Sequence, residues 1–97
     1  MDRLYSAYLG LLLAPLSEDG SRSVSLARFG TFEVRLIELA DRGMIDFWIE
    51  LYCHYTRSSL DSCKCRELDD AEPVADQLIF CARQLNQSCT EPSCYLQ

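Results

Sequence analysis

The sequence is poor in basic side chains. Its 97 residues hold nine Lys and Arg against fifteen Asp and Glu, which gives a formal net charge of −6. Nucleic acid phosphates and anionic lipid headgroups attract cationic surfaces, so this composition argues against direct binding to nucleic acid or to a membrane. A basic protein is the partner that the charge balance predicts.

Residues suited to catalysis are also few. The chain has one histidine, His54, and its four glycines form no phosphate-binding loop. A nucleophile–base pair would have to use His54, yet the neighbouring Cys53 points to the opposite face of the same predicted strand. We therefore expect no catalytic residues, no cofactor and no enzyme activity. A small thiol-dependent or metal-dependent enzyme is the alternative.

Long hydrophobic runs are absent as well. Residues 2–16 are partly apolar, but the run is too short and too interrupted to span a bilayer, and no small-residue cleavage site follows it. We expect a cytoplasmic protein in which the six cysteines are mostly reduced thiols. The length predicts a single domain over residues 1–97. Residues 88–97, which show no period, are expected to form a loosely ordered tail.

What the sequence does contain is a change of hydrophobic period along the chain. Residues 2–14 repeat at helical spacing as far as Pro15, and from Val24 the side chains alternate with a period of two, with Gly30 marking a bend or bulge. We expect strands up to residue 55, a short edge strand over 60–68 and a second helix over 71–87. The predicted fold is α+β: a small antiparallel sheet of three or four strands with an N-terminal and a C-terminal helix.

The register of the hairpin formed by residues 32–55 decides which side chains share a face. We prefer the register that places Leu39 opposite Met44, because it sets apolar side chains against one another on one side of the ribbon. A turn with a bulge at Gly43 would shift the pairing by one residue, and that alternative stays open.

The other side of this ribbon is the main candidate for a binding site, because carboxylates and large aromatic rings occur there together. In the preferred register Arg35 lies across from Trp48, and Glu33 lies across from Glu50. Two opposed carboxylates destabilise a sheet unless a cation lies between them, and a Lys or Arg of a partner would supply it. The predicted partner-binding residues of this face are Glu33, Asp46, Trp48, Glu50, Tyr52 and His54. In the alternative interpretation, the N-terminal helix covers the face and its rings belong to the core.

A second acidic group begins the C-terminal helix, behind a cap at Asp69 or Asp70. Carboxylates at a helix start each contribute about 0.3–1 kcal/mol through the helix dipole, and two of them would fill that role. The remaining carboxylates would steer a basic partner toward the protein. The residues assigned to this group are Glu67, Asp69, Asp70, Glu72 and Asp76. An ordinary solvated helix start is the alternative.

Cys63 and Cys65, with Cys53 and His54 on a neighbouring strand, could supply soft ligands to zinc. Their spacing matches no zinc finger or ribbon, so no metal site is predicted, and a metal-bound form belongs with the enzyme alternative. Cys53 and Cys81 are interpreted as small buried apolar side chains.

The hairpin over residues 32–55, followed by the Asp69-Asp70-Ala71 helix start in a small acidic chain, resembles the immunity proteins that neutralise nuclease toxins. That group includes the immunity proteins of contact-dependent growth inhibition systems. The resemblance implies a tight one-to-one complex in which carboxylates and aromatic rings block a basic toxin surface. The alternative among binding proteins is an anti-CRISPR or DNA-mimic inhibitor, although a mimic needs acids along one long face and here they fall in two patches. The sequence does not fix the oligomeric state.

Overall fold

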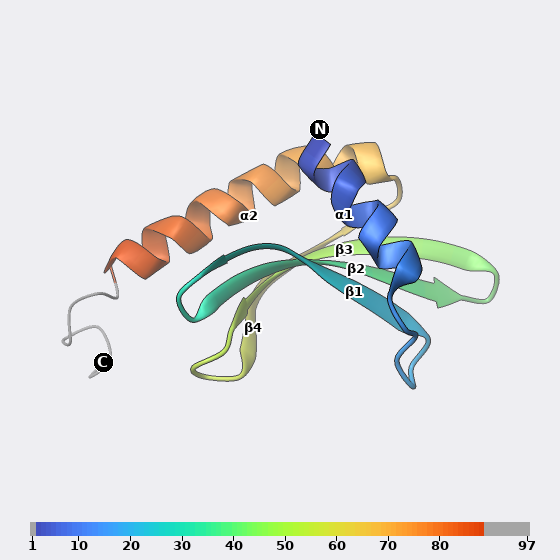
Figure 1. Cartoon of the computed structure of the whole chain (residues 1–97), viewed down its shortest axis with the longest axis horizontal. Coiled ribbons are helices and arrows are strands. Elements are labelled where there is room, and N and C mark those ends of the chain that lie inside the picture. The colour runs from blue at the N-terminus through green and yellow to red at the C-terminus, as the bar shows by residue number, and fades with distance from the viewer. Residues whose placement is uncertain (1, 89–97) are drawn as a thin grey trace.

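The computed structural model describes residues 2–88, which form two helices and four strands (Figure 1). In chain order the elements are α1 (Asp2–Leu13), β1 (Ser21–Phe29), β2 (Phe32–Asp41), β3 (Met44–Cys53), β4 (Ser58–Cys65) and α2 (Leu68–Ser88). The strands form one antiparallel sheet in the order β1-β2-β3-β4. The predicted α+β fold is confirmed, with four strands in the sheet. Of the predicted tail, Ser88 ends α2, and residues 89–97 lie outside the described residues.

Both helices pack on the same face of the sheet (Figure 1). Alternate side chains of β2 and β3 point toward them, because successive residues of a strand face opposite sides. The core consists of Phe32, Val34 and Leu36 from β2, Phe47, Ile49, Leu51 and Cys53 from β3, Cys65 from β4, Leu4 and Leu11 from α1, and Ala71, Ala75, Leu78, Ile79 and Ala82 from α2. In the described chain no helix covers the opposite face of the sheet, and we call it the uncovered face.

The second helix begins three residues earlier than predicted. Leu68 is its first residue, so Asp69 and Asp70 lie in its first turn instead of preceding it. Both residues are therefore close to the unpaired N–H groups of the helix start, where the dipole favours negative charge. The extra turn replaces the end of the predicted edge strand, which stops at Cys65. Pro73 falls beyond the first turn, where its ring nitrogen cannot donate to the carbonyl of Asp69.

A two-residue turn at Arg42 and Gly43 sets the register of the β2–β3 hairpin. Both residues have positive φ, 53° and 79°, as in the type I′ turn that matches the twist of antiparallel strands. Asp41 therefore pairs with Met44. The preferred register, with Leu39 opposite Met44, is wrong by two residues, and the bulge alternative is wrong as well. A shift of two residues keeps every side chain on its predicted face but changes its cross-strand neighbours.

Gly30 lies in the other two-residue turn, between β1 and β2, where Phe29 pairs with Phe32. Its φ of 61° falls in a region that glycine adopts readily, and a Cβ atom there would collide with the side-chain oxygen of Asn86 in α2. The glycine therefore makes a hairpin turn against the end of α2, and does not mark a bend between two short strands.

We expect Arg42→Asn to stabilise the protein. A left-handed conformation strains most side chains but suits Asn, and Asn-Gly is a preferred pair in type I′ turns. The free energy of unfolding, measured by urea denaturation, should rise by about 0.5–1 kcal/mol. Arg42→Gln removes the same charge without the conformational preference and should give no such gain. Equal effects of the two substitutions would contradict this account of the turn.

An ion pair is buried beneath α1. Glu38 lies on the helix-facing side of β2, where it is 6% exposed, and Arg22 of β1 is its cross-strand neighbour. The Arg22 Nε atom lies 3.4 Å from Glu38 Oε1, and Nη1 donates a 3.0 Å hydrogen bond to the carbonyl oxygen of Leu12. Arg22 thus neutralises a buried carboxylate and satisfies one of the last carbonyls of the helix.

Removing one member of this pair should destabilise the fold more than removing both. Glu38→Leu leaves the guanidinium group without its counter-charge. Because the Arg22 side chain is 27% exposed, we expect a loss of roughly 2–3 kcal/mol, below the ~3–5 kcal/mol of a fully buried pair. The double variant Arg22→Met/Glu38→Leu should recover most of that loss. Urea denaturation of the native protein, both single variants and the double variant measures the coupling, and purely additive losses would argue against it.

Candidate functional site

The residues of the hairpin that were predicted to bind a partner share the uncovered face. Those of β3 alternate along the strand and point away from the helices, with one residue beside them on β2 and one just past the end of β3; they are Asp46, Trp48, Glu50, Tyr52, Glu33 and His54. Trp48 is partly exposed. The alternative in which the N-terminal helix covers this face is wrong, because α1 packs on the other side of the sheet through Leu4 and Leu11.

Glu33 and Glu50 each have a partner within the chain. Arg35 lies across from Glu50; its Nε atom donates a 3.1 Å hydrogen bond to Glu50 Oε1, and its Nη2 atom contacts the same oxygen. Glu33 lies across from Tyr52, and its Oε1 atom is 2.8 Å from Nε2 of His54. The predicted opposition of the two glutamates is wrong. Because the two carboxylates do not oppose each other, no cation from a partner is needed between them.

Tyr52 lies between the Arg35–Glu50 contact and the Glu33–His54 contact. The predicted register had placed Arg35 across from Trp48, and that placement is wrong. The guanidinium carbon of Arg35 is 4.4 Å from the centre of the Tyr52 ring, which is a cation–π contact. The His54 ring packs edge-on against the same ring, with 4.9 Å between the centroids. These contacts join the charged half of the face into one network, whose side chains have little conformational freedom left to lose on binding.

The network keeps Glu33 ionised. Burial raises the pKa of its carboxyl group, but hydrogen bonds from His54 and Ser25 and the nearby charges of His54 and Arg35 outweigh that effect, so the pKa lies below the ordinary value of 4.5. A carboxylate whose pKa is lowered by folding stabilises the folded state above its ordinary pKa. That stabilisation is lost as the pH falls through the lowered value.

Glu33→Gln should therefore destabilise the protein at neutral pH, by about 1–2 kcal/mol for the lost charge-assisted hydrogen bonds. The difference in unfolding free energy between native protein and variant should shrink as the pH falls below 4.5 and disappear in stronger acid. Urea denaturation in a series of buffers from neutral to acid measures it. Glu18→Gln, at an exposed loop position, controls for the change in net charge. A difference that does not vary with pH would contradict this role of Glu33.

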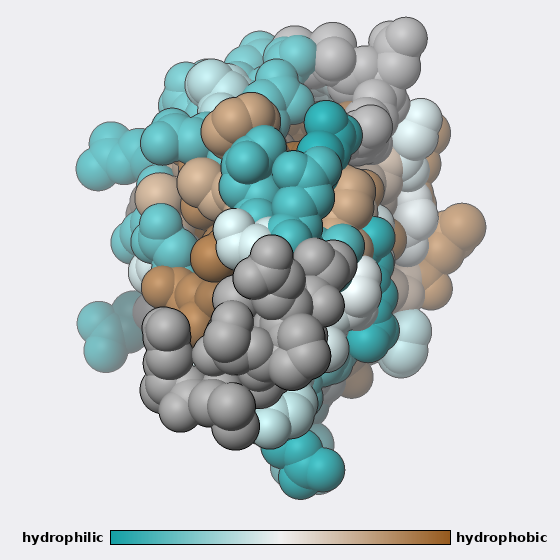
Figure 2. All heavy atoms as spheres, turned by 90° about the vertical axis from the view of Figure 1, so that its left-hand side faces the viewer, coloured by the Kyte–Doolittle hydropathy of each residue, from teal (hydrophilic) through white to brown (hydrophobic). Residues whose placement is uncertain are grey.

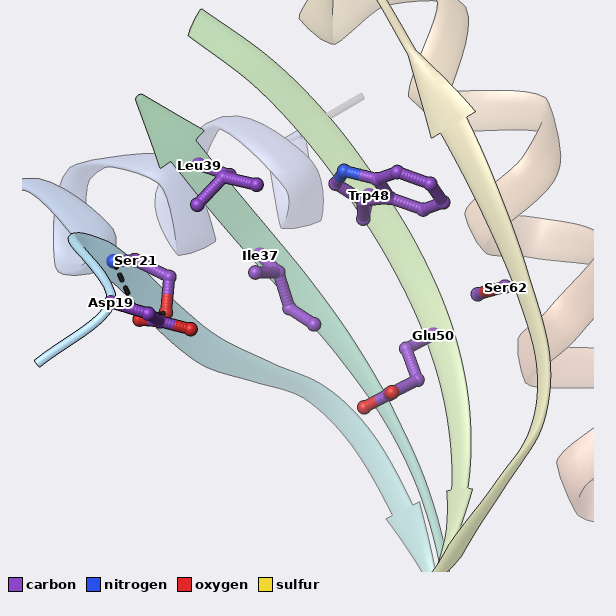
Figure 3. Close-up of a pocket in the computed structure, with 7 residues that line it drawn as sticks. All are labelled: Asp19, Ser21, Ile37, Leu39, Trp48, Glu50 and Ser62. Atoms are coloured by element: carbon purple, nitrogen blue, oxygen red, sulfur yellow. Dashed lines mark hydrogen bonds between the residues drawn. The ribbon is translucent and has the colours of Figure 1, made fainter. Parts of the chain in front are cut away.

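The other half of the uncovered face is apolar and hollowed. Ile37 lies directly across from Trp48, and Leu39 follows Ile37 on the same side of β2. Figure 3 shows these two aliphatic side chains projecting from β2 between Asp19 on one side and Trp48 on the other. The hollow has a volume of about 270 Å³ and is lined by Asp19, Ser21, Ile37, Leu39, Trp48, Glu50 and Ser62.

Five of the residues that line this hollow are not among those predicted from the sequence; they are Asp19, Ser21, Ile37, Leu39 and Ser62. Ile37 and Leu39 follow Arg35 at two-residue spacing, so the alternation of the strand could have assigned them to this face. Asp19 belongs to the polar loop before β1, and only the fold brings it here. The hydroxyl and the N–H of Ser21 donate hydrogen bonds of 2.6 and 3.0 Å to Asp19 Oδ1, and these bonds hold the pKa of Asp19 below its ordinary value.

The uncovered face retains a small excess of negative charge. Asp46 Oδ2 lies 3.4 Å from Nζ of Lys64 on β4, so this carboxylate is also paired. The carboxylates on the face nevertheless outnumber the permanently charged basic groups; the residues concerned are Asp19, Glu33, Asp46 and Glu50 against Arg28, Arg35 and Lys64. Most of the net charge of −6 therefore lies elsewhere on the molecule.

The acidic start of α2 lies on the other side of the sheet. Because α2 packs on the core side, its acidic residues share no surface with Trp48; they are Asp69, Asp70, Glu72 and Asp76. Glu67 lies in the connection between β4 and α2. Asp69 Oδ1 accepts a 2.7 Å hydrogen bond from the hydroxyl of Tyr5 in α1. This bond and the charges of Asp69 and Glu72 raise the pKa of the Tyr5 phenol. Within the described chain, no basic side chain forms an ion pair with Glu67, Asp70 or Asp76.

The cysteines of the sheet and the histidine lie on different sides of it. Cys63 and Cys65 pair with core residues of β3 and face the helices, whereas His54 faces the other way and contacts Glu33. Among the residues that the structure describes, no group of three or more His, Cys, Asp or Glu is placed to hold a metal ion. Cys53 is buried as expected, but Cys81 is only partly buried.

Cys53 lies at the turn after β3. Burial raises the pKa of its thiol, but hydrogen bonds with the side chain and backbone of Thr56 and the backbone of Tyr55 outweigh it, so the pKa lies below 9.0. His54 follows Cys53 in the sequence but points to the opposite face. This arrangement does not provide the thiol–imidazole contact that a thiol enzyme of the alternative class would use.

A second apolar surface lies on α1. Leu9 and Leu13 are 64% and 89% exposed, and exposed apolar surface of this kind can mark an interaction site. At the end of the molecule that faces the viewer in Figure 2, apolar surface occurs as separate patches between hydrophilic side chains. Within residues 2–88, neither helix is both long and apolar enough to cross a membrane. Because Leu9 and Leu13 are exposed, the α1 surface is a second candidate interaction surface, and the uncovered face has to be tested against it.

Searches of this chain against protein-family models, curated proteins and solved structures found no match.

Proposed function

We propose that this protein is a non-catalytic inhibitor that binds a basic protein through the uncovered face of its sheet. The observation that carries the proposal is the cluster of Trp48, Ile37 and Leu39 beside carboxylates on a face without a covering helix. Large rings and aliphatic side chains of this kind serve as anchors in protein interfaces. A sheet face that only contacts water commonly carries polar side chains at such positions.

A basic partner fits the charge of the protein. The net charge is −6, and the uncovered face keeps a small excess of carboxylates. The acidic residues at the start of α2 do not touch a partner seated on Trp48, because they lie on the other side of the sheet. They contribute instead to the long-range field, which speeds the association of a cationic protein and weakens with salt.

The ion pairs of the uncovered face have a different role in this proposal from the one that the sequence suggested. They do not leave a gap for a cation of the partner. They hold Arg35 and Tyr52 in place beside the hollow, and a side chain that is already fixed loses little entropy when a partner binds. The charged half of the face is then a rigid rim, and the apolar half around Trp48 supplies the anchor.

A nuclease toxin is the partner that we propose within this class, because a nuclease presents a basic surface to the phosphates of its substrate. The protein would then act in the cytoplasm as an immunity protein of the contact-dependent growth inhibition type, in a one-to-one complex that covers the toxin surface. A DNA-mimic or anti-CRISPR inhibitor is the second candidate within binding proteins. The division of the acidic residues between two sides of the sheet favours the first.

Trp48→Ala should weaken binding to the basic partner by at least about tenfold, as expected for a central aromatic anchor. The partner is identified by pull-down with the intact chain, beginning with the product of a neighbouring toxin gene, and binding is measured by calorimetry. Asp70→Lys should instead slow association several-fold at low salt and leave the dissociation rate unchanged.

Leu9→Ser on α1 is the matched control for the Trp48 variant, because it also removes a large exposed apolar side chain. It should bind the partner as tightly as the native protein does. Loss of binding on Leu9→Ser with full binding by Trp48→Ala would place the interface on α1 and overturn the proposal.

A further inference from the structure

The hollow beside Trp48 has the size of one long side chain. Its volume of about 270 Å³ falls below the roughly 300–1,000 Å³ of clefts that hold cofactors or drug-sized ligands. The lining residues follow an order across the hollow. Asp19 lies at one side, Ile37 and Leu39 lie in the middle, and the indole ring of Trp48 lies at the other side (Figure 3). A ligand with an aliphatic stem and a cationic head matches that order.

We infer that the hollow binds one arginine side chain of the basic partner, an inference that rests on the proposed function. The aliphatic stem lies on Ile37 and Leu39, and the guanidinium group lies against the ring of Trp48, as cations do on aromatic faces. Asp19 and Glu50 supply the negative charge at the two sides of the hollow.

Both carboxylates offer an oxygen atom to such a ligand. Ser21 donates to Oδ1 of Asp19, and Arg35 donates to Oε1 of Glu50. These hydrogen bonds use one oxygen of each carboxylate. They hold both groups in place beside the hollow, which is the preorganised state that favours binding.

Arginine fits the hollow better than lysine does. Its guanidinium group is planar, stacks on aromatic rings and carries five N–H donors, so it can lie on the indole and reach carboxylates at the edges. The ammonium group of lysine is compact and strongly hydrated, and it gives up more hydration on an apolar floor. The site should therefore bind arginine more tightly than lysine. It should also bind a charged side chain more tightly than a neutral one.

Trp48 provides a direct readout, since it is the only tryptophan in the chain. We would titrate the intact protein with the peptide acetyl-Gly-Arg-Gly-amide and follow tryptophan fluorescence, with citrulline and lysine peptides of the same design as controls. Citrulline keeps the shape of arginine without its charge. We expect saturable binding of the arginine peptide in the millimolar range and binding at least about threefold weaker for each control.

Asp19→Asn tests the carboxylate, and Glu18→Gln is its matched control, because both residues are exposed in the same loop and only Asp19 lines the hollow. Asp19→Asn should weaken the arginine peptide by roughly two- to fivefold, the size of one exposed ion pair. Glu18→Gln should leave its affinity unchanged. Equal binding of the arginine and citrulline peptides, or equal effects of the two substitutions, would overturn the arginine site.

The same variants separate this inference from the proposed function. A basic partner that binds Asp19→Asn as tightly as the native protein rejects the arginine site and leaves the uncovered face as the interface. Arginine-peptide binding at Trp48, together with a partner whose affinity does not respond to Trp48→Ala, would show that the hollow accepts arginine but would reject both the proposed interface and the assignment of that arginine to the partner.

Discussion

The turn at Arg42 and Gly43 fixes the pairing of β2 with β3, and the division of this molecule into two unlike sides depends on that pairing. With Asp41 opposite Met44, one set of alternate side chains meets the helices and the other set meets solvent. A slip of one residue would exchange the two sets and bury the ion pairs in place of the core. The backbone conformations of Arg42 and Gly43 therefore decide both which side chains form the core and which lie on the proposed binding face.

The alternation of side chains was sufficient to predict which residues of the hairpin share a face. It did not show that the helices leave this face uncovered, and it did not show which side chains are neighbours on it. Trp48 and Tyr52 both occupy even-numbered positions of β3, so they stay on the same face even when the predicted register is wrong by two residues. The same error assigns Glu33 the wrong cross-strand neighbour, because cross-strand contacts change with each step of the register. A periodic pattern cannot distinguish registers of equal parity, and the conformation of Arg42, which decides between them, carries little sequence signal.

The buried pair of Arg22 and Glu38 illustrates a second limit of the sequence. Glu38 follows Phe32, Val34 and Leu36 at two-residue spacing, so its position on the core side of β2 was available from the pattern. A glutamate is seldom buried without a partner, and its partner comes from a strand whose bounds were predicted only approximately. Asp19 reaches the hollow in the same way, from a loop that carries no period.

The location of both helices on one side of the sheet has a consequence for how this chain can change over generations. In the described chain, residues of the uncovered face contact no helix. Outside the network of Glu33, Arg35, Glu50 and His54, mutations on the proposed recognition surface can therefore accumulate with little effect on the free energy of unfolding. Such an architecture allows a binding protein to follow a diverging target while its scaffold stays intact.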